Sequence, residues 1–154
     1  MNLNPNAIRE KFGDYYIADE RTFIMGIDQR LTKHFAERFT GLNTLETCTG
    51  AGFTTISLAR TAKHVITVEI DGSIQKKAIS NIKKAGLSAK VSFLLGSILE
   101  KETIKKIPKV DAVFIDPDWA VTGTDHIYRF QQSNTRPPAD LVLRNMLKIT
   151  DNVA

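Results

Sequence analysis

The sequence predicts an α/β fold, an open parallel β-sheet that is doubly wound so that helices cover both of its faces. The first observation is an alternation of four short β-branched or apolar runs with helical segments, joined mostly by short connections. The second is size, because 154 residues make about one domain. The third is composition: 42% hydrophobic and 25% charged residues are ordinary for a globular domain and exclude disordered, collagen-like and coiled-coil chains.

The predicted elements follow one another from Asp28, which can cap a helix that runs to about residue 39. We expect residues 1–26 to form an N-terminal extension and residues 27–154 to form the domain itself, in partial form. Strand propensity predicts strands at residues 44–48, 65–70, 91–95 and 110–115. Apolar residues at helical spacing predict helices at residues 54–62, 73–85, 98–106 and 139–148.

The segment after Asp116 supplies only a long loop and one helix, so we expect the sheet to lack its last strands. The strand at residues 110–115 would then be an exposed apolar edge, which is prone to pair with another strand. A second copy of the chain or the strand of a partner is expected to cover this edge. Three explanations stay open: a fragment of a longer protein, a truncated gene product, or a protomer that a partner completes.

The first predicted strand runs into a glycine-rich loop, Glu46-Thr47-Cys48-Thr49-Gly50-Ala51-Gly52. Its two glycines allow a tight turn with room for a ligand against the backbone. The third glycine of the dinucleotide fingerprint is replaced by Thr55, and no Gly-Lys-Ser/Thr is present, so neither a dinucleotide site nor a P-loop is favoured. Because Glu46 would repel a pyrophosphate, the loop favours a ligand with a positive ammonium or sulfonium centre. An ordinary tight turn is the alternative.

The second and fourth predicted strands end in carboxylates. Glu69 ends the second strand, where an acidic residue can accept hydrogen bonds from ribose hydroxyls, while Asp71 can cap the next helix. The fourth strand is followed by Asp116-Pro117-Asp118-Trp119. A hydrogen-bond acceptor beside an aromatic plate suits a planar base that carries an exocyclic amine. The alternative is that Trp119 closes the edge of the core and Asp116 starts a turn.

These residues, in this order and spacing, resemble those of a class I S-adenosylmethionine-dependent methyltransferase, which has a Rossmann-like fold. The resemblance covers about residues 20–145. Within that superfamily the chain is most similar to the trimethylguanosine synthase-like group, the RNA cap guanine-N2 methyltransferases. The similarity to this group rests on the helix at residues 29–36, the loop Cys48-x-Gly50-x-Gly52 and Trp119.

The resemblance implies S-adenosylmethionine as cofactor, with S-adenosylhomocysteine as product, and RNA or a nucleotide as acceptor. It implies cofactor contacts at Glu46, Thr47, Gly50, Gly52, Glu69, Ile70, Ser97 and Asp116. It also implies catalytic roles at the end of the fourth strand, where Asp116 and Pro117 would face the amine and Trp119 would stack on the base. Asp118 and Phe23 are implied to line the substrate pocket. The chain departs from the family pattern at Asp118, where a second proline is usual, and at Ser97, where an aspartate is usual.

Charge and cysteine content set wider limits. The 21 basic and 17 acidic residues permit a polyanionic partner without demanding one, and we expect Arg9, Lys11, Arg21 and Arg136 nearest the pocket rim. The single cysteine, Cys48, excludes an internal disulfide and favours a reducing, cytoplasmic setting. No apolar run is long enough for a membrane span, and no histidine has metal-ligand spacing, so neither a membrane nor a metal is expected.

The function that these observations favour is transfer of a methyl group from S-adenosylmethionine to an exocyclic amine of a nucleobase in RNA, of the guanine-N2 type. Two alternatives stay open. One is a truncated or degenerate methyltransferase-like domain that binds cofactor or a partner without catalysis. The other is a class I methyltransferase for a small molecule or a protein.

Overall fold

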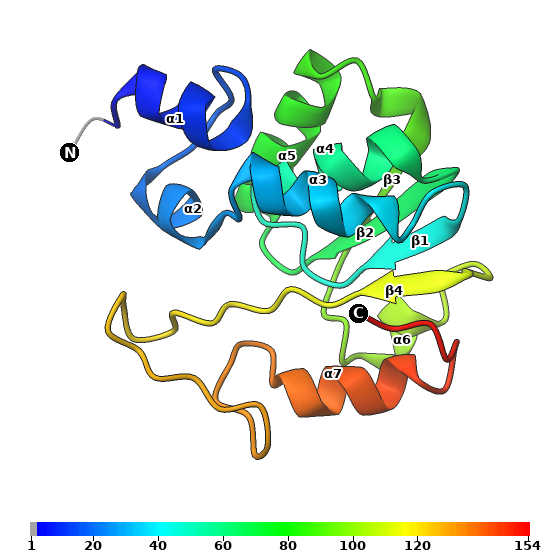
Figure 1. Ribbon diagram of the computed structural model, residues 1–154. Coiled ribbons are helices and arrows are strands. Elements are labelled where there is room, and N and C mark those ends of the chain that lie inside the picture. Colours follow the sequence, from blue (N-terminus) through cyan, green and yellow to red (C-terminus); the bar gives the residue numbers. More distant parts are fainter. Residues whose placement is uncertain (1–2) are drawn as a thin grey trace.

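A four-stranded sheet organises the computed structural model, which describes residues 3–154 (Figure 1). Its strands are β1 (Asn43–Glu46), β2 (His64–Glu69), β3 (Val91–Leu95) and β4 (Ala112–Phe114), in the order β3-β2-β1-β4. All three strand pairs are parallel. The chain moves outward from β1 to β3 and then returns to the other side of β1 for β4. This reversal is the topological switch point, where ligands of such sheets bind.

Helices cover both faces of the sheet, as the alternating pattern predicts (Figure 1). One face carries α3 (Gln29–Glu37), α4 (Phe53–Thr61) and α5 (Gly72–Lys84), followed by the 3-10 turn Ser88–Lys90. The other carries α6 (Lys101–Ile104) and α7 (Ala139–Met146). Two apolar clusters result, one on each face: the first includes Phe39, Leu58 and Ile82, and the second includes Leu45, Val142 and Met146.

The N-terminal segment folds into α1 (Pro5–Phe12) and α2 (Glu20–Met25), which pack beside α4 and α5. The ring of Phe12 stacks on that of Phe53, with centroids 3.6 Å apart and planes inclined by 9°. The buried side chain of Asn81 in α5 accepts a hydrogen bond from the Ile17 amide at 2.7 Å and donates to the Ile17 carbonyl at 2.9 Å. The same Nδ2 donates to the Ala51 carbonyl at 2.9 Å. Asn81 therefore joins the N-terminal segment to the glycine-rich loop.

The prediction that β4 is an exposed edge strand is wrong, because residues 152–154 of the same chain pair with it. Val113 forms a parallel bridge with Val153. The Val113 amide donates to the Asn152 carbonyl at 2.9 Å, and the Ala154 amide donates to the Val113 carbonyl at 2.9 Å. The helix α7 returns the chain across one face, so the residues after it run parallel to β4.

None of the helices within residues 3–154 is both long enough and apolar enough to cross a bilayer.

Candidate functional site

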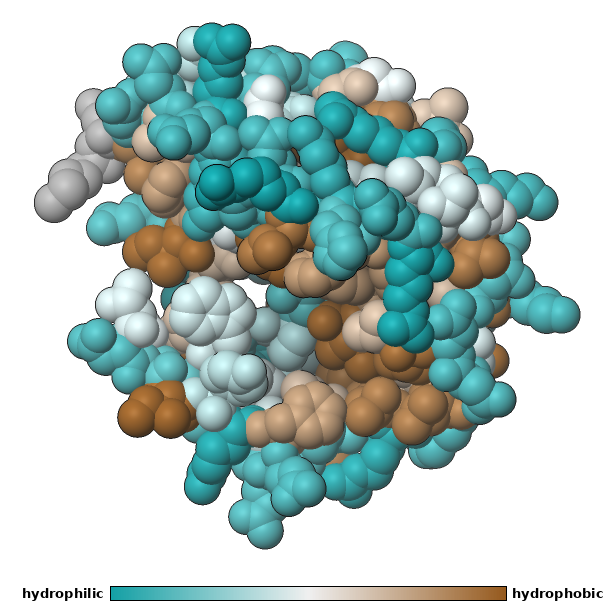
Figure 2. Space-filling view, viewed as in Figure 1, coloured by the Kyte–Doolittle hydropathy of each residue, from teal (hydrophilic) through white to brown (hydrophobic). Residues whose placement is uncertain are grey.

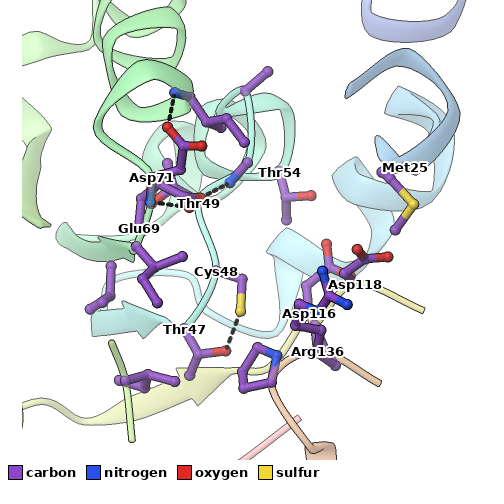
Figure 3. A pocket seen from close by; sticks show the side chains of 18 of the residues that line it. Met25, Thr47, Cys48, Thr49, Thr54, Glu69, Asp71, Asp116, Asp118 and Arg136 are labelled. Carbon is purple, nitrogen blue, oxygen red and sulfur yellow. Dashed lines mark hydrogen bonds between the residues drawn. The ribbon is translucent and has the colours of Figure 1, made fainter. Parts of the chain in front are cut away.

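A cavity of about 530 Å³ lies at the carboxyl ends of β1, β2 and β4. Its volume lies in the range of small-molecule sites. The glycine-rich loop and the end of β2 form one side, and the segment after β4, the start of α7 and α2 form the other. Figure 2 shows the surface hollowed between the N-terminal helices and the long loop. Figure 3 shows Glu69 and Asp71 on one side of the cavity and Asp116, Asp118 and Arg136 on the other.

The glycine-rich loop has positive φ angles, which residues other than glycine rarely adopt. Gly50 has φ of 54° and Gly52 has φ of 84°. A Cβ atom on Gly52 would also lie 3.2 Å from Cα of Ala78, so the loop approaches α5 closely. Glycine is thus required at Gly52 for two reasons, its dihedral angle and the space beside it.

Glu69 ties the end of β2 to this loop. Its Oε2 accepts a hydrogen bond from the Gly50 amide at 3.0 Å, and its Oε1 accepts one from the Asp71 amide at 3.0 Å. Burial raises the pKa of Glu69 above its ordinary value, while these amides act in the opposite direction. The carboxyl group lines the cavity with both oxygens held in place. Since each carboxylate oxygen has two lone pairs, it can still accept from a ligand hydroxyl.

Glu46 lies behind the cavity wall, fully buried, and is not one of the lining residues. Its Oε2 accepts hydrogen bonds from Thr55 Oγ1 at 2.5 Å and Thr67 Oγ1 at 2.6 Å, whereas its Oε1 has no partner. Burial raises its pKa to about 8, and the nearby carboxylates of Asp116 and Glu69 act in the same direction. Thr67 Oγ1 is also 2.6 Å from Oγ1 of Thr49, a lining residue, so a chain of polar groups connects Glu46 with the wall.

The opposite end of the cavity is made by Asp116, Pro117 and Asp118. Burial raises the pKa of Asp116 to about 7, so near neutral pH this carboxyl group is close to equally divided between its acid and base forms. The segment is held by backbone pairing: the Asp118 amide donates to the Arg136 carbonyl at 2.8 Å, and the Arg136 amide donates back at 3.0 Å. This end therefore offers carboxylates that can accept hydrogen bonds, one of them able to take up a proton.

The cavity brings together most of the residues that the sequence nominates. Thr47, Gly50, Glu69, Ile70, Ser97, Asp116, Pro117 and Asp118 line it, as do the expected rim residues Arg21 and Arg136. Glu46 and Gly52 support its wall from behind.

Four nominated residues lie elsewhere. Phe23 meets the edge of Phe12, with ring centroids 5.7 Å apart, and belongs to the first apolar cluster. Trp119 is half-buried next to Asp118 but does not line the cavity. Lys11 donates from Nζ to the Phe23 carbonyl at 2.5 Å, and the guanidinium of Arg9 lies over the ring of Tyr15. Both side chains therefore make contacts within the N-terminal segment and not at the cavity.

Several lining residues were not nominated from the sequence, among them Met25, Phe53, Thr54, Ile74, Pro137 and Pro138. Phe53 and Thr54 carry a usable signal, because they open the helix that directly follows a glycine-rich turn. Met25 and the two prolines carry none, since tertiary packing alone brings α2 and the start of α7 to this cavity.

Cys48 also lines the cavity, and Thr47 Oγ1 donates to its Sγ at 3.8 Å. Burial raises the pKa of this thiol far above its ordinary value, so it stays protonated and is a poor nucleophile. No cluster of three or more His, Cys, Asp or Glu side chains that could hold a metal ion occurs in the described part of the chain.

A family model described as RNA cap guanine-N2 methyltransferase matches residues 42–154. The match begins just before β1 and includes the glycine-rich loop, Glu69 and the segment after β4.

Solved structures share the fold. A candidate methyltransferase from Porphyromonas gingivalis W83 superposes with a TM-score of 0.76 over 96% of this chain and 37% of its own, at 17% identity. A candidate RNA methyltransferase from Pyrococcus horikoshii gives 0.57 over 81% of this chain and 54% of its own, at 18% identity. The O-methyltransferase TomG from Streptomyces achromogenes, solved with S-adenosylmethionine, gives 0.51 over 75% and 52%, at 24% identity. The chain thus spans about half or less of the length of these structures, and the likeness establishes a Rossmann-like class I methyltransferase fold.

Proposed function

Because this chain belongs to the RNA cap guanine-N2 methyltransferase family, we propose that it binds S-adenosylmethionine in the cavity and methylates an exocyclic amine of an RNA base, of the guanine-N2 type. The observation that carries the proposal is the pairing of two carboxyl groups across one cavity, Glu69 on one side and Asp116 on the other (Figure 3). Membership of the family confirms the resemblance seen in the sequence and supports RNA as the acceptor.

The residues present fit this cofactor. The cavity is of nucleoside size, and its glycine-rich side has no Cβ at Gly50 to occupy the space beside the loop. Glu69 and Ser97 both line the cavity. Glu69 would accept hydrogen bonds from the ribose hydroxyls, and Ser97 would lie near the adenine. The carboxylates of Glu69, Asp71 and Asp118 on the wall suit a ligand with positive charge. The repulsion of a pyrophosphate expected from Glu46 is not supported, because this group lies behind the wall and burial raises its pKa to about 8.

When bound, the cofactor supplies an electrophilic methyl group on a sulfonium. The chain's own part is to orient the acceptor and exclude water, since correct placement provides much of the rate in such transfers. Asp116 and the Pro117 carbonyl would accept hydrogen bonds from the amine of the base and fix its direction. With a pKa of about 7, Asp116 can then take the proton that the amine loses. The free thiol of Cys48 suits a reducing compartment, and we place this reaction in the cytoplasm.

Titration calorimetry with S-adenosylmethionine and S-adenosylhomocysteine tests the cofactor site. Glu69→Ala should weaken binding roughly tenfold or more, because it removes charged hydrogen bonds to the ligand. Glu102→Ala is the matched control, since Glu102 is exposed on α6 and bonds only to Lys105. It should bind both ligands as the unaltered chain does.

Incubation of RNA with S-adenosylmethionine carrying a labelled methyl group, followed by mass spectrometry of the nucleosides, tests the acceptor. Methylated guanosine with the label on N2 is the expected product. A folded chain with no saturable cofactor binding would contradict the proposal and favour the non-catalytic alternative. Label on a small molecule or a protein, and none on RNA, would instead support the other alternative.

A further inference from the structure

An ion pair spans the mouth of the cavity between two elements far apart in the sequence. Arg21 on α2 donates through Nη2 to Asp118 Oδ2, 97 residues later, and both residues line the cavity. The side chain of Asp118 is 17% exposed and that of Arg21 is 56% exposed. The carboxylate is therefore largely covered, whereas the arginine stands mostly in solvent and can leave at little cost.

Asp118 is held in place independently of Arg21. Its backbone amide and carbonyl both pair with Arg136, at 2.8 and 3.0 Å. Its Oδ1 accepts a hydrogen bond from the Ala120 amide at 3.0 Å. With Oδ1 engaged in this way, Oδ2 is the oxygen presented to Arg21. When Arg21 moves away, a fixed carboxylate oxygen facing the cavity remains.

The chemistry of Arg21 indicates which ligand group can take its place. A guanidinium offers only N–H donors, so the position beside Oδ2 accepts a donor and rejects an acceptor. The pairing edge of guanine presents the N1–H donor next to its N2 amine. The same edge of adenine presents N1 as an acceptor, which would face the carboxylate oxygen without a proton between them.

We propose that Asp118 selects guanine, accepting a hydrogen bond from N1–H at the position that the Arg21 guanidinium occupies in the free protein. This inference rests on the proposed function, in which Asp116 and Pro117 hold the neighbouring N2 amine. In the free protein Arg21 donates to Asp118 Oδ2 in place of the base. When the acceptor base binds, Arg21 and the base compete for this oxygen.

The two halves of the ion pair are expected to act in opposite directions. Asp118→Asn removes the charge that attracts N1–H, and an amide tolerates either edge, so the preference for guanine over adenine should fall. Arg21→Ala removes the competitor, so the same preference should rise. A pair with only a structural role would give losses in both variants.

Fluorescence anisotropy with short labelled RNAs measures this preference without catalysis. Each RNA is uridine-rich with one central guanine, inosine or adenine, and the protein is first saturated with S-adenosylhomocysteine. Guanine and inosine both carry N1–H, so both should bind about tenfold or more tightly than adenine through this charge-assisted contact. Asp118→Asn should remove that difference, and Arg21→Ala should increase it.

Lys77→Ala provides the control, because Lys77 pairs with Asp19, the N-cap of α2, and does not line the cavity. It removes an ion pair of the same helix and should leave the preference unchanged. Far-ultraviolet circular dichroism verifies the fold of each variant. If Asp118→Asn does not fold, the Arg21→Ala variant tests the inference: a higher preference for guanine over adenine supports it, and a lower preference contradicts it.

Equal binding of the guanine and adenine RNAs by the unaltered chain would overturn the inference. So would a shift of the preference in the same direction in both variants, or a gain for every RNA in Asp118→Asn. In those cases S-adenosylhomocysteine still binds and the proposed function stands. A chain that does not bind S-adenosylhomocysteine at all contradicts the proposed function, and the inference falls with it.

Discussion

The two ends of the cavity are built in different ways. The end around Glu69 consists of strand termini and a glycine-rich loop, which Glu69 joins by accepting hydrogen bonds from the Gly50 and Asp71 amides. Behind this wall, the buried carboxyl group of Glu46 accepts a hydrogen bond from Thr55. The end around Asp118 consists of the segment after β4, joined to the segment before α7 by two backbone hydrogen bonds and to α2 by one ion pair whose arginine is 56% exposed. The first end is rigid and costly to alter, while the second can exchange partners. A site that always binds one cofactor but must admit and release an acceptor benefits from this division.

The largest expected effect lies at the rigid end and depends on pH. The pKa of Glu46 rises from 4.5 to about 8 on folding, so between these values the folded chain holds a proton that the unfolded chain has released. The stability from this group is complete below pH 4.5 and is lost as pH rises toward 8. Glu46→Gln cannot titrate. On going from pH 4.5 to pH 8 it should therefore gain roughly 4 kcal/mol in unfolding free energy relative to the unaltered chain.

Urea denaturation at the two pH values measures this difference. Asp116 titrates in the same direction and is present in both proteins, so only the part of its contribution that depends on the charge of Glu46 enters the difference. Glu102→Gln is the control, because its exposed carboxyl group should give the same pH dependence as the unaltered chain. A constant difference between Glu46→Gln and the unaltered chain would show that the pKa of Glu46 does not rise on folding.

A second, smaller effect at the rigid end concerns Gly52. Gly52→Ala forces a side chain into φ of 84° and places its Cβ 3.2 Å from Cα of Ala78. We expect a loss of about 2 kcal/mol in stability, since strain and crowding add. Gly86→Ala separates the two causes, because Gly86 has φ of 73° with no atom within 4 Å of the added Cβ. Thermal unfolding should show the smaller loss for Gly86→Ala, and equal losses would mean that the approach to Ala78 costs nothing.

The smallest effect is expected at the exchangeable end. Arg21→Ala removes an ion pair whose arginine is more than half exposed, so the unfolding free energy should change by about 0.5 kcal/mol or less. Its effect should appear in ligand preference instead. Thermal unfolding at low and high salt gives the measurement. A loss of stability as large as that of Gly52→Ala would mean that both ends of the cavity are equally rigid, which would contradict the difference described above.

Sequence reasoning recovers the rigid end better than the exchangeable one, for a physical reason. The strands β1, β2 and β4 lie close to the predicted positions, because strand propensity and the glycine and acidic residues that follow a strand are local signals. A parallel sheet then brings their carboxyl ends together whatever the side chains. The Glu69 to Gly50 contact follows from this topology.

The direction of single side chains does not follow from local signals. Glu46 turns away from the cavity because Thr55 and Thr67, on two other elements, hold its carboxyl group. Trp119 belongs to the motif that the sequence singles out after β4, yet the cavity lining along that segment ends at Asp118. The contact between Arg21 and Asp118 joins residues 97 positions apart, and no periodicity or motif encodes it.

The hydrogen bonds of Asn81 have a consequence for protein synthesis. Ile17 is added to the growing chain 64 residues before Asn81, so the N-terminal segment has no docking partner on α5 during that interval. The wall that α2 contributes to the cavity can form only after α5 has been made, and the facing wall only after residue 136. A nascent chain therefore presents a glycine-rich loop open to solvent, and a binding-competent cavity arises late in translation.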